Sequence, residues 1–278
     1  MKKSLIILST CLIALGSCSK DEVAEPLPNN TGNNNDNNDI SLNLKINEDQ
    51  NATLFFYTST GCPGCGSWGG PTFKNLINNY ATDVTPIAIH IKYNDPYISS
   101  VSQDIANNRT GSYYTPQLHI ENTNIVVLNG GSIDGNASVQ QANDSINGIS
   151  SNTPIASSGS IYQVNDDKLT IKYGTQFHTA ATGEFYVAAY IIEDGLVYAQ
   201  SGANTSYVHN NVIRASVNGN SFGSLIKNGD IVADELFENQ TSFPINQTWN
   251  LDNIKITTVI WEKVGNNYQV INSSVFHL

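Results

Sequence analysis

Hydrophobic and polar residues follow two different patterns along the chain, and the first covers residues 40–150, where strand patterns alternate with helical ones. Residues 40–46 alternate between apolar and polar and predict a half-buried strand, while the apolar run at 53–58 predicts a strand covered on both faces. Other strands are predicted at 86–91, 117–120 and 124–128, and helices at 73–80, from Asp95-Pro96 through Ile105, and at 139–149. This order favours parallel strands joined by helical crossovers, an α/β fold.

The second pattern covers residues 161–278 and contains strand after strand with few helical periods. Residues 151–160 are rich in Ser and include Pro154 and Gly159, so we expect a linker there. Glu193-Asp194-Gly195 is a hairpin turn signal. Strands are predicted at 168–173, 185–192, 196–198, 207–217, 254–261 and 268–276. Short strands with Gly and Asn turns predict an all-β sandwich of the immunoglobulin-like type.

The first 17 residues have the pattern of a signal peptide. Lys2 and Lys3 are positive, and the apolar stretch at 4–15 is shorter than the ~20 residues of a membrane-spanning helix. Leu15-Gly16-Ser17-Cys18 then resembles a bacterial lipobox, which implies that Cys18 carries a lipid such as palmitate and becomes the mature N-terminus. This interpretation predicts an outer-membrane lipoprotein in the cell envelope. The alternative is an ordinary signal peptide that contains Cys18.

Residues 18–39 are polar and rich in Asn. Such a tract buries too little apolar surface to fold, so we predict a disordered tether. Ser19-Lys20-Asp21-Glu22, directly after Cys18, resembles the surface-export signal of Bacteroidetes lipoproteins. The alternative is that this charged run is only the solvated start of the tether.

Charge is sparse and mostly acidic, with 13 Lys+Arg against 24 Asp+Glu and a formal net charge of −11. A nucleic-acid partner is therefore not expected, because binding phosphates requires a basic surface. The four cysteines divide by position. Cys11 lies in the signal peptide and Cys18 is the lipidation site, which leaves Cys62 and Cys65 as a two-thiol pair.

Cys62-Pro63-Gly64-Cys65 stands between the buried strand at 53–58 and the helix that follows. At a helix N-terminus the unpaired N–H groups and the helix dipole favour a thiolate, so Cys62 is the expected nucleophile toward a partner disulfide and should be partly exposed. Cys65, one turn later, is placed to resolve the mixed disulfide by bonding to Cys62. These two cysteines are therefore the candidate catalytic, redox-active pair.

With Thr115-Pro116 before a later strand, this motif resembles the thioredoxin fold over about residues 40–150. The resemblance implies that Pro116 follows a cis peptide bond beside the cysteines and positions the backbone of the partner, as a third residue of the catalytic site. A cis X-Pro bond costs only ~0.5–1 kcal/mol relative to trans. Two departures argue against an efficient general reductase: Gly61 replaces the usual tryptophan, and Phe56 replaces the buried acid of many reductases.

Alternatives to redox exchange stay open for the cysteine pair: a permanent disulfide, or a relic in a binding protein. Metal binding is a weaker alternative, since two thiolates suit Cu(I) or Zn but closed zinc sites need four ligands. His90 and His119 lie in strand settings that are typical of packing residues. We therefore predict no metal site and no cofactor, and whether the protein is an enzyme, a thiol–disulfide oxidoreductase, stays open.

Residues 186–197 and then 207–214 resemble a family of Bacteroidetes lipoproteins named for a twenty-eight-kilodalton outer-membrane protein. The resemblance implies a lipobox, a thioredoxin-like domain and a β-sandwich in one chain. The leading hypothesis is thiol–disulfide exchange with envelope or surface proteins. The alternative is a surface binding or adhesion lipoprotein in which the thioredoxin-like domain is a scaffold. His209 and Arg214 have opposite parity on a strand, so we expect them to face opposite ways and to be structural.

Overall fold

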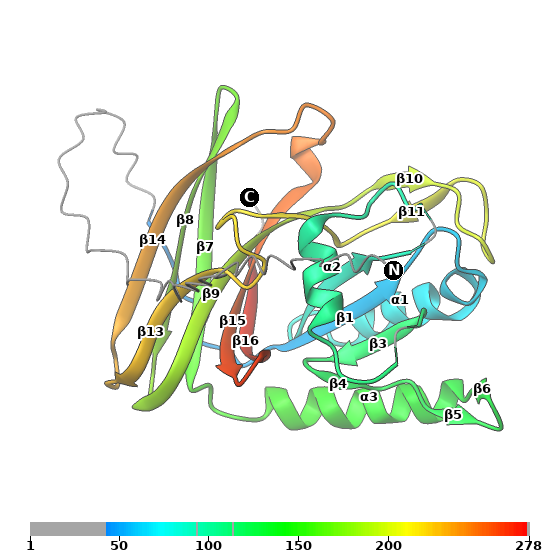
Figure 1. Cartoon of the computed structure of the whole chain (residues 1–278), viewed down its shortest axis with the longest axis horizontal. Helices are drawn as coiled ribbons and strands as arrows, with labels where there is room; N and C mark the ends of the chain where they lie inside the picture. The colour runs from blue at the N-terminus through cyan, green and yellow to red at the C-terminus, as the bar shows by residue number, and fades with distance from the viewer. Residues whose placement is uncertain (1–42, 93, 113, 277–278) are drawn as a thin grey trace, which may run out of the picture. The chain divides into compact units, whose positions relative to one another are not determined.

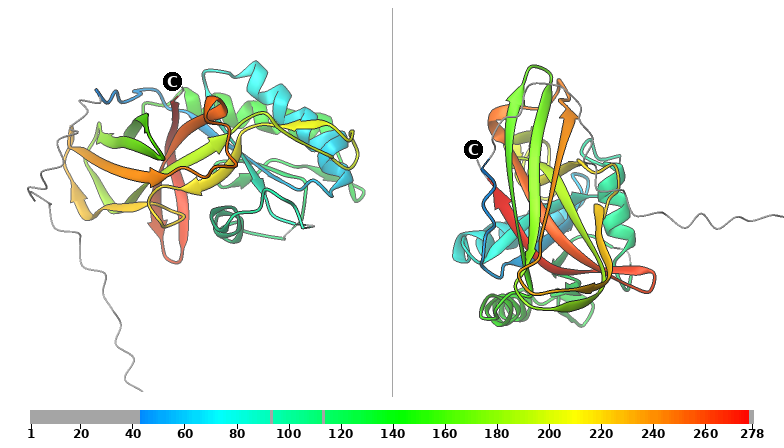
Figure 2. Two further views of the ribbon diagram at one scale, coloured as in Figure 1. Left: turned by 90° about the horizontal axis from the view of Figure 1, so that it is seen from above. Right: turned by 90° about the vertical axis from the view of Figure 1, so that its left-hand side faces the viewer.

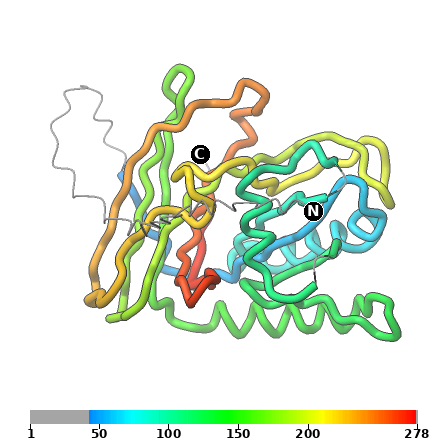
Figure 3. The backbone as a smooth tube through the Cα atoms, in the orientation of Figure 1, coloured from blue at the N-terminus to red at the C-terminus, as the bar shows by residue number. Residues whose placement is uncertain are grey.

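The computed structural model describes residues 43–92, 94–112 and 114–276, a unit whose backbone path can be followed in Figures 1 and 3. The predicted signal peptide, the tether up to residue 39 and the lipidation site Cys18 lie outside the described residues. In the part that is described, no helix has the length and apolar character needed to cross a bilayer.

The first half of this unit is a small mixed sheet with helices on both faces. Its elements are β1 (Ala52–Thr58), the π-helical turn η1 (Cys65–Gly69), α1 (Gly70–Asn79), β2 (Val84–His90), α2 (Ser100–Asn107), β3 (Gln117–Ile120), β4 (Thr123–Asn124), β5 (Leu128–Asn129), β6 (Ser132–Ile133) and α3 (Gly135–Ser150). The fully buried β1 confirms the strand predicted from the apolar run. β1 pairs with β2 in parallel but with β3 antiparallel, so the expected parallel pairing is correct on one side of β1 only.

The strand predicted at 40–46 is wrong over its described part, because residues 43–46 form no strand. Their alternation is nevertheless reflected in burial: Leu44 and Ile46 are half-buried, and Lys45 between them is exposed. The segment runs against β7 (Ala156–Asn165), and just after it the Asn47 N–H donates to the Ser158 carbonyl at 3.2 Å. One bond is too few to make a ladder.

The second half is built of long antiparallel strands. After β7 come β8 (Lys168–Phe177), β9 (Ala181–Glu193), β10 (Leu196–Tyr198), β11 (Tyr207–His209), β12 (Val212–Ser216), β13 (Ser224–Ile231), β14 (Leu236–Pro244), the 3₁₀ turn η2 (Leu251–Asn253), β15 (Ile254–Val264) and β16 (Asn267–Phe276). The turn signal at Gly195 does not join β9 and β10 into a hairpin. β10 instead pairs with β11, which follows it. The second half of the expected linker, residues 156–160, belongs to β7 and is buried. Its serines are small enough to pack beneath β15, where the hydroxyls of Ser158 and Thr258 lie 2.9 Å apart.

Two sheets pack face to face in this half. β14, β8 and β7 form a three-stranded sheet, and β9, β15 and β16 belong to the larger one (Figure 2). Between them lie Leu169 and Ile171 of β8 with Val187 and Ile191 of β9, all fully buried. The layering is that of a sandwich, and its immunoglobulin-like type stays a prediction.

The larger sheet also contains the strands of the first half. The path through its nine strands is β16-β15-β9-β12-β2-β1-β3-β4, and β13 pairs with β9 beside this path. β12 connects the halves, because it pairs antiparallel with β9 and parallel with β2 through Val212 and Ala88. The Ala88 N–H also donates to the Asn211 carbonyl at 2.7 Å. The α/β half and the β-rich half therefore share one hydrogen-bonded sheet.

Each face of the α/β part has its own core. α1 and α3 cover one face, where Phe56 and Leu118 pack against Leu76 and Ile146. α2 covers the opposite face together with side chains of β9 and β15, among them the buried Trp261. Because these two cores fix β1 from both sides, the turn that follows β1 has a rigid base.

Candidate functional site

Cys62 stands directly before the first helical residue after β1, as the sequence predicts. Pro63 occupies the first helical position, where a proline is favourable because no N–H partner is needed there. The Cys65 N–H donates to Cys62 Sγ at 3.1 Å, so this sulfur has the position of an N-cap acceptor. The two cysteines form a disulfide, with their Cα atoms 5.2 Å apart.

Pro116 lies beside this turn and follows a cis peptide bond from Thr115, which confirms the expected geometry. A Cβ atom added to Gly64 would lie 3.1 Å from Pro116 Cδ, and one added to Gly69 would lie 2.8 Å from Pro116 Cβ. The proline ring therefore contacts the helix that carries both cysteines. The catalytic roles of Cys62, Cys65 and Pro116 remain predictions.

The expectation that Cys62 is partly exposed is wrong, because its relative exposure is 4% and that of Cys65 is 1%. The segment 199–206, which joins β10 to β11 and which we call the cap loop, packs against the turn that holds Cys62. Gln200 of this loop donates from Nε2 to the Cys62 carbonyl at 3.0 Å and to the Ser59 carbonyl at 3.1 Å. Figure 1 shows the β10–β11 hairpin reaching along the helix that carries the cysteines.

Asp95 was predicted to begin a helix, but it fixes the turn before Cys62 instead. Its Oδ2 accepts hydrogen bonds from His90 Nδ1–H at 2.7 Å and from the Thr60 N–H at 2.6 Å. The helix α2 starts later, with Ser99 as its N-cap. Burial opposes ionisation of Asp95, but the hydrogen bonds from His90 and from the Thr60 and Tyr97 N–H groups outweigh it and hold the pKa of this carboxyl below its usual value.

His209 and Arg214 do not face opposite ways as predicted. They lie on separate strands, β11 and β12, because Asn211 between them has a positive φ of 59°. Both contact Tyr97: the His209 ring centre lies 5.4 Å from the Tyr97 ring centre, and the Arg214 guanidinium carbon lies 5.6 Å from the same ring centre. Burial, with His90 nearby, lowers the pKa of His209 to about 4, so this imidazole is neutral at neutral pH.

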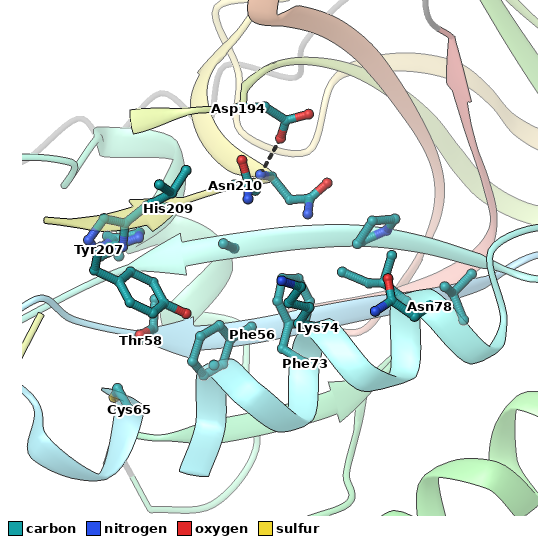
Figure 4. A pocket seen from close by; sticks show the side chains of 18 of the residues that line it. Phe56, Thr58, Cys65, Phe73, Lys74, Asn78, Asp194, Tyr207, His209 and Asn210 are labelled. Atoms are coloured by element: carbon teal, nitrogen blue, oxygen red, sulfur yellow. Dashed lines mark hydrogen bonds between the residues drawn. The ribbon is translucent and has the colours of Figure 1, made fainter. Parts of the chain in front are cut away.

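A cavity of about 570 Å³ lies between α1, β2 and the β10–β11 hairpin (Figure 4). Cys65 lines one end of it, Phe56 and Phe73 line its apolar side, and His209 and Asn210 line it from the hairpin. The hairpin therefore contacts residues 59–65, which we call the cysteine turn, and also closes one side of this cavity. Sequence patterns did not place this hairpin near the cysteines, because the two segments are about 140 residues apart.

Within the described residues, no group of three or more His, Cys, Asp or Glu side chains could hold a metal ion. His90 makes its hydrogen bond to Asp95, and His119 is buried in β3.

No family model matches the sequence, and neither does any curated protein. Among solved structures, HBP35 of Porphyromonas gingivalis is 17% identical with a TM-score of 0.65, over 84% of this chain and 77% of HBP35. This similarity shows a shared fold. A domain of the outer membrane lipoprotein Omp28 from the same organism is 11% identical with a TM-score of 0.32, over 46% of this chain and 90% of that domain. A similarity this low supports no further argument, so membership of the predicted family stays a prediction.

Proposed function

We propose that the chain is an envelope lipoprotein whose Cys62–Cys65 pair exchanges electrons with the thiols or disulfides of other envelope proteins. The observation that carries this proposal is the position of Cys62 at a helix N-terminus, with the Cys65 N–H directed at its sulfur and the cis-linked Pro116 against the same turn. A helix N-terminus stabilises negative charge, so the thiolate of the reduced form is favoured on Cys62.

In the reducing direction, the Cys62 thiolate attacks one sulfur of a partner disulfide. The partner's S–S bond breaks, a bond forms between Cys62 and the attacked sulfur, and the other partner sulfur leaves with the electron pair and takes up a proton. Cys65 then loses its proton and attacks Cys62 Sγ. The Cys62–Cys65 disulfide forms and the second partner thiol is released, so two electrons pass to the partner. The reverse sequence oxidises a partner dithiol.

Equilibration in buffers of reduced and oxidised glutathione tests this proposal. The pair is expected to pass from disulfide to dithiol within the range that such buffers cover, while the chain stays folded. Mass spectrometry of the alkylated peptide that contains Cys62 and Cys65 measures the reduced fraction, and circular dichroism follows the fold. Structural disulfides typically resist reduction by glutathione. A pair that is reduced only when the chain unfolds would contradict an exchange function.

Attachment to the envelope is proposed from Cys18, and a single substitution tests it. Cys18→Ala removes the thiol that the predicted lipobox uses, so the chain is expected to move from the membrane fraction to the soluble fraction of the envelope. Immunoblotting of the separated fractions measures this shift, and Cys11→Ala is the matched control, expected to stay with the membrane. Retention of the Cys18→Ala chain in the membrane fraction would argue for a different anchor.

A second candidate function is that of a binding lipoprotein whose cysteine pair is only structural. The burial of both cysteines, in a turn against which the cap loop packs, favours it, because a buried Cys62 is poorly accessible to a partner disulfide. The chain entropy removed by a bridge across two residues is small, which argues against a mainly stabilising role. The glutathione equilibrium separates the two candidates.

A further inference from the structure

The cap loop contacts the cysteine turn through its backbone as well as through Gln200. The Ser201 N–H donates to the Thr60 carbonyl at 2.8 Å. The contact is close enough to require glycine on both sides. A Cβ atom on Gly202 would lie 2.0 Å from the Pro63 carbonyl oxygen, and one on Gly66 would lie 2.3 Å from the Ser201 carbonyl oxygen. No room is left between the two backbones for a substrate.

The Gln200 side chain is the main polar contact between the cap loop and this turn. Its relative exposure is 5%, and its Nε2 has three carbonyl oxygens within hydrogen-bond distance: those of Ser59, Cys62 and Ser201. Two of these acceptors are on the cysteine turn and one is on the cap loop itself. Replacing this side chain by a methyl group therefore removes the side-chain hydrogen bonds between the two segments and leaves the backbone bond from Ser201 to Thr60.

The hairpin that carries the cap loop is separate from the large sheet. β10 and β11 have three residues each, and among the strands that the structure describes they pair only with each other. Val197 and Val208, on these strands, are 63% and 48% exposed. The cap loop can therefore lift away by breaking the contacts of Gln200 and Ser201, without separating any pair of strands in the nine-stranded sheet.

We propose that the cap loop determines which molecules react with Cys62, and that Gln200 holds it closed. In the closed form the cysteine turn excludes large partners. Displacement of the cap loop uncovers Cys62 and breaks the hydrogen bonds from the loop to the carbonyl groups of Ser59, Thr60 and Cys62. This inference rests on the proposed function for its purpose, but the access that it describes is measurable without any exchange activity.

Alkylation of Cys62 in the full-length Cys65→Ser chain measures this access. Iodoacetamide is the small probe, and a maleimide that carries a long polyethylene glycol chain is the large one. Peptide mass spectrometry distinguishes Cys62 from Cys11 and Cys18. With Gln200 in place, the large probe is expected to react far more slowly at Cys62 than it does in the same chain unfolded in urea. Adding Gln200→Ala should raise the rate with the large probe by about three- to tenfold, as expected from the loss of buried hydrogen bonds, and raise the rate with the small probe less.

Two further variants make the result decisive. Gln163→Ala is the matched control, because Gln163 is in β7 of the other sheet, and it should leave both rates unchanged. Gly202→Ala displaces the cap loop by steric conflict with Pro63 instead of by loss of hydrogen bonds, and it should raise the rate with the large probe as Gln200→Ala does. Circular dichroism verifies that each chain is folded.

Equal large-probe rates in the parent, Gln200→Ala and Gly202→Ala chains would overturn the inference, and so would a parent rate equal to that of the unfolded chain. Failure of the glutathione equilibrium alone would contradict the exchange function but leave the control of access intact. Faster labelling in both cap-loop variants, with the control unchanged, supports the inference.

Discussion

In the Cys65→Ser chain, mixed disulfides between Cys62 and its partners are expected to accumulate, whereas the Cys62→Ser chain should form none. Cys65 supplies the only thiol one helical turn from Cys62, so its removal leaves the first exchange step intact and stops the second. Exchange activity should be lost completely in either variant. Non-reducing gel electrophoresis of envelope extracts, followed by mass spectrometry of the retained bands, measures the trapped species and identifies the partners.

The double variant Cys62→Ser/Cys65→Ser is the control for capture through Cys18 or by non-covalent binding. The bands that the Cys65→Ser chain retains must be absent from the double variant, and they must disappear on treatment with dithiothreitol. If the Cys65→Ser chain retains no more protein than the double variant, even with Gln200→Ala added to open the cap loop, the exchange function is wrong. The scaffold interpretation would then be the better one.

Trp261→Ala is expected to produce the largest loss of stability, about 3–5 kcal/mol in the free energy of unfolding. The side chain is 1% exposed and donates from Nε1 to the Tyr190 hydroxyl at 3.1 Å. Its ring also stacks on Phe55 of β1, with ring centres 6.1 Å apart. It therefore joins the core of the β-rich half to the strand that leads to the cysteines. Urea unfolding followed by circular dichroism measures the loss.

Trp249→Ala is the matched control for this substitution. Trp249 is only partly buried and stacks on Phe243, away from β1, so its loss should cost clearly less. Because the halves share one sheet, the urea midpoint at which the amides of β1 lose protection from hydrogen exchange should equal the midpoint by circular dichroism in the Trp261→Ala chain, and both should fall. Separate midpoints would show that the halves unfold independently.

Local patterns in the sequence were sufficient to predict the helices and strands around the cysteines. The apolar run at 53–58 reports burial on both faces, and Pro63 marks the first turn of a helix, so the position of Cys62 follows from neighbours a few residues away. The cis bond before Pro116 came from resemblance to a known fold and not from the residues themselves. β1, β2, β3, α1 and α3 all lie close to where the periodicity placed them.

Contacts between distant segments were not predictable in this way. Gln200 is 138 residues from Cys62, and no periodicity indicates that its amide reaches the Cys62 carbonyl. Asp95 followed by proline has the local pattern of a helix start, but His90 and Thr60 compete successfully for its carboxylate. The burial of Cys62 could therefore not be predicted, although its place on the helix could.

The position of β12 between β2 and β9 has a consequence for the newly made chain. Residues 52–150 leave the ribosome first, while the edge of β2 still lacks the strand at 212–216 that pairs with it. An unpaired edge is prone to pair with other chains, so the nascent protein passes through an aggregation-sensitive interval. The segment that later covers Cys62 is also made only after both cysteines have emerged. An oxidant that acts after export, but before the cap loop has packed on the turn, therefore meets both cysteines uncovered, and this access ends once the chain has folded.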